Sequence, residues 1–248
     1  MGMTRAFCFA GLALLTAGPA GGRPQEEISL HRDAHPAARP TRGIIRNLPD
    51  IKLTLRDKVR VAQETNFYGV AGVSNTTVDY GLPDYWNLGV SFLNAQFYTA
   101  GGFQQTFQPD VMLNIEKFLP LGTFGTAIIG AQTGAAVYPE GAELINFSYL
   151  DFVWPTLGGR LDLDVGAYFA NEALAGGNTF GVHLNVAIPV GKYLRLTGDY
   201  LSGRGKLSGM TLKVLVPVAA AWHLGVGVQM PTPHSNNDYS GLLGIYWN

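Results

Sequence analysis

The sequence predicts an all-β fold, an antiparallel β-barrel that spans a membrane with about ten strands. Three observations support this prediction: segments with a large apolar residue at every second position, connections that alternate between short and long, and aromatic residues near the strand ends. The clearest segment is residues 160–170, which read RLDLDVGAYFA. Its two leucines and its valine fall on one face of a strand, and its two aspartates fall on the other. Such segments predict strands with one apolar and one small or polar face.

The N-terminus has the pattern of a secretory signal peptide. Arg5 precedes an apolar run from Ala6 to Leu15, and small residues follow as far as Ala20. The apolar run is well short of the roughly 20 residues that a membrane-spanning helix needs. We therefore predict that residues 1–20 are a signal peptide, cleaved after Ala20. Cleavage would also remove Cys8, the only cysteine, so the exported protein would have no disulfide and no cysteine-ligated metal.

Residues 21–50 are predicted to be a disordered leader, because they are rich in proline and charge and follow neither a helical nor a strand period. His31 and His35 lie in this leader, where Pro36 and the lack of an apolar face favour a solvated tail over a metal site.

Residues 51–84 form a segment of ambiguous pattern, read either as an extra hairpin or as a periplasmic or plug extension. Apolar and basic residues alternate from Ile51 to Val61, but Asp57 interrupts the apolar face. A carboxylate facing lipid costs roughly 1–3 kcal/mol away from the interface. This cost favours ten strands, with twelve as the alternative if the segment supplies a hairpin.

Residues 85–248 are predicted to form the barrel itself. Short turns are expected at 119–123, 155–159, 189–192 and 217–221, and longer loops at 100–110, 138–143, 171–179, 202–209 and 231–240. The ten predicted strands between them are 85–99, 111–119, 123–137, 144–154, 160–170, 180–189, 192–201, 210–218, 221–230 and 241–247. Strict alternation of tight turns and longer loops is typical of barrels whose two ends face different compartments.

Composition excludes several other classes of protein. The formal net charge of −1 argues against nucleic acid as a partner. Only 14% of the residues are charged and 32 are glycine, so the second face of each strand is too small and too neutral for a soluble β-sandwich. The strand pattern continues from residue 85 to the end, which predicts a single domain.

The last strand has a characteristic ending, SGLLGIYWN, in which Leu243, Ile245 and Trp247 alternate up to the final aromatic residue. Together with the signal peptide and the series of hairpins, this ending resembles Gram-negative bacterial outer-membrane β-barrel proteins of the small porin-like type, without indicating a subfamily. The resemblance implies a location in the outer membrane, contact with membrane lipids, and an assembly signal that the barrel assembly machinery reads. Asn248 follows the aromatic residue that usually ends this signal.

Any function of the barrel interior would depend on the side chains that face inward. With the apolar faces toward lipid, the predicted lumen-lining charged residues and histidine are Glu116, Arg160, Asp162, Asp164, His183, Arg195, Asp199 and Lys213. Neighbouring strands lie roughly 4.8 Å apart, so acidic and basic side chains can pair between them. Two interpretations remain open: the charges line a narrow channel for small hydrophilic solutes, or they fill a closed barrel that serves structure or adhesion through its external loops.

A lipid hydrolase embedded in the barrel is a third alternative. Acyl hydrolysis needs a nucleophilic serine or threonine within reach of an oriented histidine. His183 and His223 both face inward, but on strands that are not neighbours and without an adjacent serine. We therefore expect no catalytic residue, no cofactor and no metal site, and the sequence carries no signal for an oligomeric state.

Overall fold

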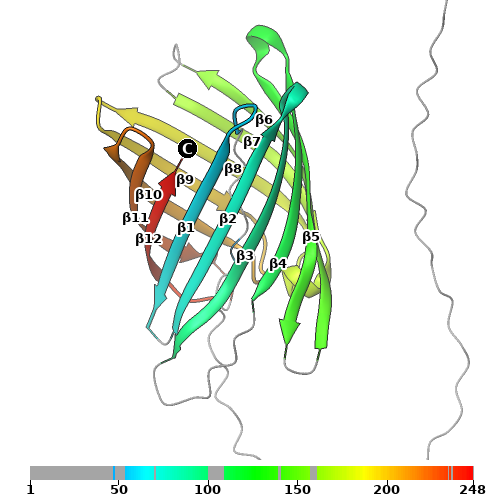
Figure 1. Ribbon diagram of the computed structural model, residues 1–248. Helices are drawn as coiled ribbons and strands as arrows, with labels where there is room; N and C mark the ends of the chain where they lie inside the picture. The colour runs from blue at the N-terminus through cyan, green and yellow to red at the C-terminus, as the bar shows by residue number, and fades with distance from the viewer. Residues whose placement is uncertain are drawn as a thin grey trace, which may run out of the picture. The chain divides into compact units, whose positions relative to one another are not determined.

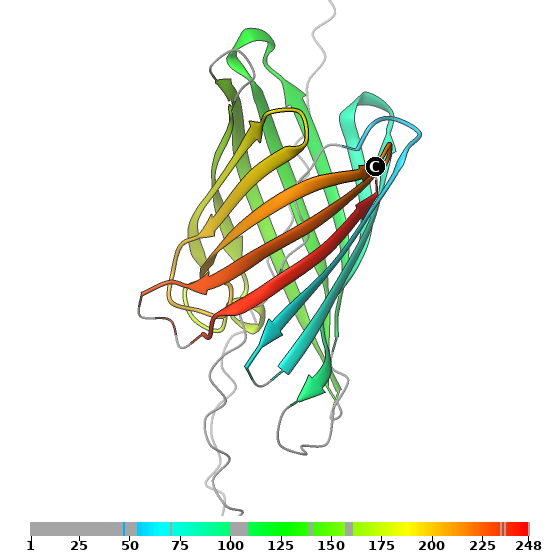
Figure 2. The same cartoon turned by 90° about the vertical axis from the view of Figure 1, so that its left-hand side faces the viewer.

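Twelve antiparallel strands form a closed barrel in the computed structural model, which describes residues 47, 54–69, 71–99, 109–138, 141–156, 161–233, 235 and 237–247. The strands are β1 (Val59–Tyr68), β2 (Ala71–Leu82), β3 (Trp86–Thr99), β4 (Asp110–Pro120), β5 (Thr126–Tyr138), β6 (Gly141–Thr156), β7 (Leu161–Ala170), β8 (Phe180–Val190), β9 (Leu194–Leu201), β10 (Gly209–Ala219), β11 (Trp222–Pro231) and β12 (Ser240–Trp247). Each strand pairs with its neighbour in sequence, and β1 pairs with β12 to close the barrel (Figure 1). Figure 2 shows this seam, with β12 in red beside β1 in blue.

Only one α-helical turn and two 3-10 turns accompany the strands in the described residues. They are η1 (Pro83–Tyr85), η2 (Gly122–Phe124) and α1 (Glu172–Ala175). None of the described helices has the length and apolar character needed to cross a membrane.

The strand count corrects the preference for ten strands and confirms the alternative of twelve. Segment 51–84 supplies a hairpin, because β1 and β2 pair along nearly their whole length. Asp57 lies outside the strand, in a turn before β1 with a φ of 58°, and its exposed side chain accepts a hydrogen bond from the Tyr80 hydroxyl at 3.2 Å. A carboxylate at the end of the barrel wall does not carry the cost expected of one in the middle of a lipid-facing strand. The predicted signal peptide lies outside the described residues, as does the predicted leader apart from Asn47.

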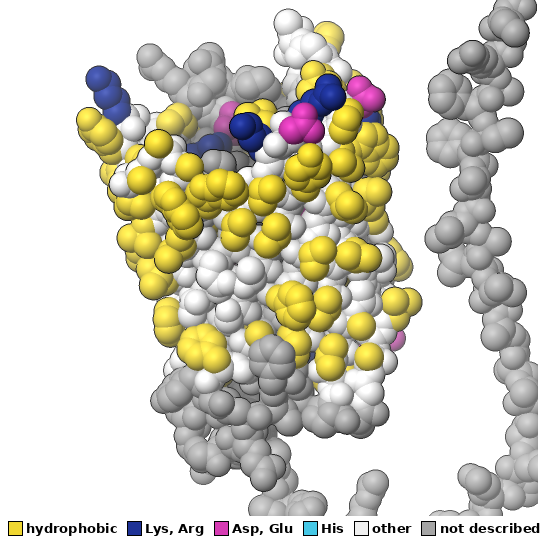
Figure 3. All heavy atoms as spheres, viewed as in Figure 1, with side chains coloured by type: hydrophobic (Ala, Val, Ile, Leu, Met, Phe, Trp, Pro, Cys, Tyr) yellow, Lys and Arg dark blue, Asp and Glu magenta, His cyan; other side chains and the backbone are white. Residues whose placement is uncertain are grey.

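The barrel wall separates an apolar outer face from a largely polar inner face. In β12, Leu243 and Ile245 are exposed on the outside, whereas Leu242 and Tyr246 are buried inside. Apolar side chains cover the visible outer wall in Figure 3, while lysine, arginine and acidic side chains gather at its upper rim. An apolar band of this kind is the surface that a membrane-spanning barrel presents to lipid.

The connections at the two ends of the barrel differ less regularly than the sequence predicts. The loop expected at 138–143 is shorter, because β5 runs to Tyr138 and β6 begins at Gly141. The connection from β1 to β2 is also short, spanning only residues 69–70, although it lies at the end of the barrel that carries the longer loops. The alternation of lengths is therefore real for β7–β12 but not strict along the whole chain.

Three longer loops at that end bond to one another: residues 171–179, residues 202–208 and the described residues between 232 and 239. The Lys206 amide donates to the Ala175 carbonyl at 2.6 Å, and the Thr232 hydroxyl donates to the Gly203 carbonyl at 3.0 Å. Leu174 of α1, which belongs to the first of these loops, is fully buried. We call these three loops the loop layer, since they form one hydrogen-bonded structure.

Candidate functional site

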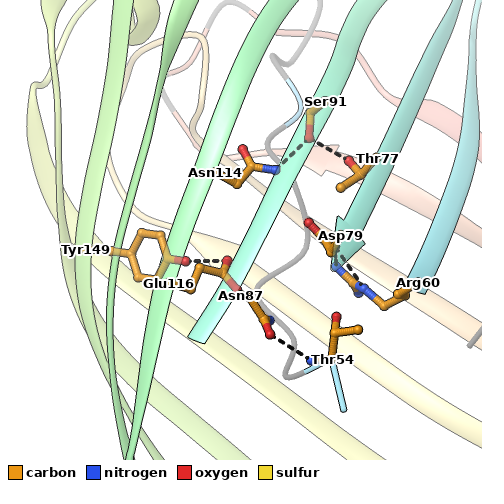
Figure 4. Close-up of polar contacts among 9 residues, drawn as sticks. All are labelled: Thr54, Arg60, Thr77, Asp79, Asn87, Ser91, Asn114, Glu116 and Tyr149. Carbon is orange, nitrogen blue, oxygen red and sulfur yellow. Dashed lines mark hydrogen bonds and ion pairs between the residues drawn. The ribbon is translucent and has the colours of Figure 1, made fainter. Parts of the chain in front are cut away.

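Polar side chains from β1 to β6 fill one part of the barrel interior (Figure 4). Arg60 of β1 and Asp79 of β2 form a buried ion pair, with 2.6 Å between Nη2 and Oδ2 and a further bond of 3.0 Å from Nε. Both side chains are withdrawn from water, where a charge needs a partner to be tolerated. This pair therefore lies at the edge of the packed interior, where Arg60 also borders the cavity described below.

A second buried group surrounds Glu116 of β4. Its carboxylate accepts a hydrogen bond from the Tyr149 hydroxyl at 2.6 Å and another from the Asn87 amide at 3.2 Å. The Asn87 side-chain oxygen in turn accepts from the backbone amide of Thr54 at 3.2 Å. Glu116 thus points inward, but its partners hold it within the packed part of the interior.

Two described residues that precede β1 lie inside the barrel. Asn47 and Thr54 are both buried. The Asn47 amide donates to the Asn94 side chain of β3 at 2.9 Å, and Gln229 of β11 donates to the Asn47 side chain at 3.1 Å. Asn47 therefore connects two strands that are not neighbours in the barrel, as a plug-like segment would.

An open cavity of about 400 Å³ follows the inner faces of β8–β12. Its wall reaches from Lys192 and Tyr193, in the tight turn between β8 and β9, to Leu207 in the loop layer and Gly209 at the start of β10. Arg60 and Glu64 of β1 and Phe147 of β6 also border this cavity. The interior is therefore filled mainly along β2–β6 and open mainly along β8–β12.

Five of the predicted lumen-lining residues border this cavity: Asp164, His183, Arg195, Asp199 and Lys213. Asp162 lies beside it and pairs with Arg195, with 2.8 Å between Oδ2 and Nη2. Lys213 pairs at 2.7 Å with Glu64 of β1, whose carboxylate also accepts a hydrogen bond from the Tyr246 hydroxyl. Arg160 lies outside the described residues.

His183 of β8 is the centre of an acidic group on the cavity wall. Its Nδ1 atom is 3.1 Å from Oδ2 of Asp151, and its Nε2 atom is 2.9 Å from Oδ2 of Asp199. Asp164 completes the group and is buried. The contact between β6 and β8 passes over Gly166 of β7, where any side chain would overlap with the Asp151 carboxylate.

Sequence reasoning missed four charged residues of the interior that matter here: Asp151, Arg60, Asp79 and Glu64. Asp151 is difficult to recognise from the sequence, because β6 has large apolar residues on both faces. The other three fall in the segment of ambiguous pattern. In all four cases, continuing the period of two from a neighbouring inward residue would have identified them.

Leu243, Ile245 and Trp247, the proposed assembly signal, occupy the closing strand. Leu243 and Ile245 face outward, and Trp247 pairs with Val61 of β1 and Trp222 of β11. These residues lie on the strand that closes the barrel, so the assembly machinery would have to bind them before β12 pairs with β1. That the machinery recognises them stays a prediction.

A closed twelve-stranded barrel with an apolar outer face and a polar, partly open interior defines a porin-like fold. Solved porin structures that match this chain include the following two. The NanC porin covers 77% of this chain and 100% of its own length, with a TM-score of 0.56 and 10% identity. The KdgM porin, solved in complex with disordered oligogalacturonate, covers 76% and 98%, with a TM-score of 0.55 and 10% identity. No protein-family model and no curated protein matches the sequence, so the similarity concerns the fold.

Proposed function

We propose that this protein is a narrow outer-membrane channel for small hydrophilic solutes. The cavity along β8–β12 carries the proposal, because residues near both ends of these strands line it. The apolar outer wall and the porin-like fold support the membrane location.

The charges on the cavity wall are of both signs. Arg195 and Lys213 provide cations, and Asp164 and Asp199 provide carboxylates. Opposed charges create a field across a narrow passage, which favours polar and charged solutes over apolar ones. The solute class we propose is therefore small and hydrophilic.

A closed barrel that acts in structure or adhesion is the second candidate, and the loop layer favours it. Its loops bond to one another and cover buried side chains, as a rigid binding surface would. Solute passage distinguishes the two functions, because a closed barrel would conduct no ions.

Planar-bilayer recordings on the purified, refolded protein test the channel. We expect discrete conductance steps. The substitution Arg195→Gln removes a cation from the cavity wall, so the reversal potential in a salt gradient should shift toward cation selectivity. Arg204→Gln is the matched control, because Arg204 lies exposed in the loop layer and does not line the cavity.

The absence of conductance steps for correctly folded protein would refute the channel and leave the closed barrel. Equal shifts for Arg195→Gln and Arg204→Gln would show that ions do not pass along β8–β12.

A further inference from the structure

We propose that Asp151, Asp164 and His183 form a binding site for a divalent transition metal such as zinc, inside the barrel. One candidate ligand atom from each residue lies within 4.8 Å of the other two, and all three residues are buried. The residues come from β6, β7 and β8, so the barrel wall fixes their relative positions.

The buried carboxylates are not fully bonded without a cation. Asp164 is 7% exposed and Asp151 is 1% exposed. In each, the Oδ1 atom is inaccessible to water and has no hydrogen-bond partner among the described residues. Burying a carboxylate oxygen without a partner is costly, and a cation bound beside the two carboxylates would offset that cost.

The histidine is oriented as a metal ligand would be. Its Nδ1 atom lies 3.1 Å from Asp151 Oδ2. Two ligands of a tetrahedral zinc, each at roughly 2.0–2.2 Å, are separated by about 3.3–3.5 Å, so this hydrogen-bonded pair would need to separate by only a few tenths of an ångström to admit the metal. The other ring nitrogen, Nε2, faces Asp199 Oδ2 at 2.9 Å. A carboxylate in that position commonly holds the ring of a metal-bound histidine in place.

The donor atoms select the class of metal. A histidine nitrogen with two carboxylates suits zinc and similar transition metals, whereas magnesium and calcium prefer oxygen ligands alone. Asp164 and His183 line the cavity, so a metal can enter from the lumen and a water molecule can complete its coordination. This metal binding is separate from solute passage.

Calorimetric titration of zinc chloride into the refolded, chelator-treated protein in detergent tests the site. We expect one equivalent of zinc to bind. Asp199→Asn should weaken binding by roughly 10–100-fold, the usual effect of losing the partner of a metal-bound histidine. Asp164→Asn and His183→Gln, which remove ligands, should weaken it at least as much.

Asp162→Asn is the matched control, since Asp162 lies two residues before Asp164 on the same inner face but pairs with Arg195. It should keep the affinity of the unaltered protein. No zinc binding, or equal losses for Asp162→Asn and Asp164→Asn, would overturn the proposal in favour of a protonated His183 held between carboxylates. If Asp164→Asn does not fold, His183→Gln decides between the same outcomes. The titration involves no conductance, so its failure is distinguishable from failure of the channel.

Discussion

Two ion pairs in the barrel differ sharply in exposure, and exposure sets what each contributes to stability. The Arg60 and Asp79 side chains are 5% and 7% exposed, whereas those of Arg195 and Asp162 are 43% and 44% exposed. Water and salt screen the second pair, which makes such pairs worth about 0–1 kcal/mol. Breaking the first pair would leave a buried charge without its partner.

Asp79→Asn should therefore lower the free energy of unfolding by about 3–5 kcal/mol. Asp162→Asn, the same change at the exposed pair, should lower it by no more than about 1 kcal/mol. Urea titrations of both variants in lipid vesicles, followed by tryptophan fluorescence, measure the difference. Equal losses would mean that water reaches Arg60.

The sequence identifies most of the charged residues of the candidate site but not their partners. Asp164, His183 and Asp199 are found because their strands alternate clearly between apolar and polar residues. Asp151 is missed because the inner face of β6 carries Ile145 and Phe147, which look as apolar as its outer face. Which charges pair also depends on register, and a period of two leaves register open.

At the scale of elements, Gly166 allows β6 and β8 to interact across the strand between them. The Asp151 carboxylate occupies the space where a side chain at residue 166 would be. The glycine is thus needed for close approach rather than for an unusual backbone conformation. One small residue of β7 therefore determines whether the acidic group around His183 can form.

Gly166→Ala should destabilise the barrel by roughly 1–3 kcal/mol, the usual cost of overpacking. It should also weaken zinc binding, because Asp151 must move. Gly241→Ala in β12 is the control, since a methyl group there would meet no atom within 4 Å. Unfolding and zinc titrations of both variants test this, and a neutral Gly166→Ala would show that Asp151 moves without cost.

Strand prediction succeeds where one face is consistently apolar and fails where a strand end carries charge. The pattern predicts the last strand at 241–247, and the strand is Ser240–Trp247. The pattern disfavours the first hairpin because it assigns Asp57 to the lipid-facing stripe, whereas β1 begins only at Val59. Where a strand starts relative to the membrane interface depends on the whole barrel. The alternation within a single strand therefore does not predict its first residue.

For the whole molecule, the outer wall sets the environment in which the barrel is stable. Val226 near the middle of β11 and Val218 near the end of β10 are both exposed. In a membrane, the first would meet the hydrocarbon core and the second the interface. The loss of stability caused by a charged residue at each position therefore reports how deeply that position lies in the bilayer.

Val226→Arg should destabilise the barrel by about 2–4 kcal/mol and Val218→Arg by about 0–1 kcal/mol, as charges do at the midplane and interface of a bilayer. Unfolding in lipid vesicles tests this. Losses that do not depend on position would argue against a membrane-spanning wall.

The interior is uneven, packed mainly along β2–β6 and open mainly along β8–β12. Residues on the two sides are therefore under different constraints. Side chains of the open wall that face the cavity, such as Arg195, have space around them, so substitutions there can alter what fits inside with little loss of stability. Substitutions on the packed wall disturb many partners at once. A lineage of such barrels could therefore diversify its specificity on one wall while the other preserves the fold, and engineered libraries should be confined to the same side.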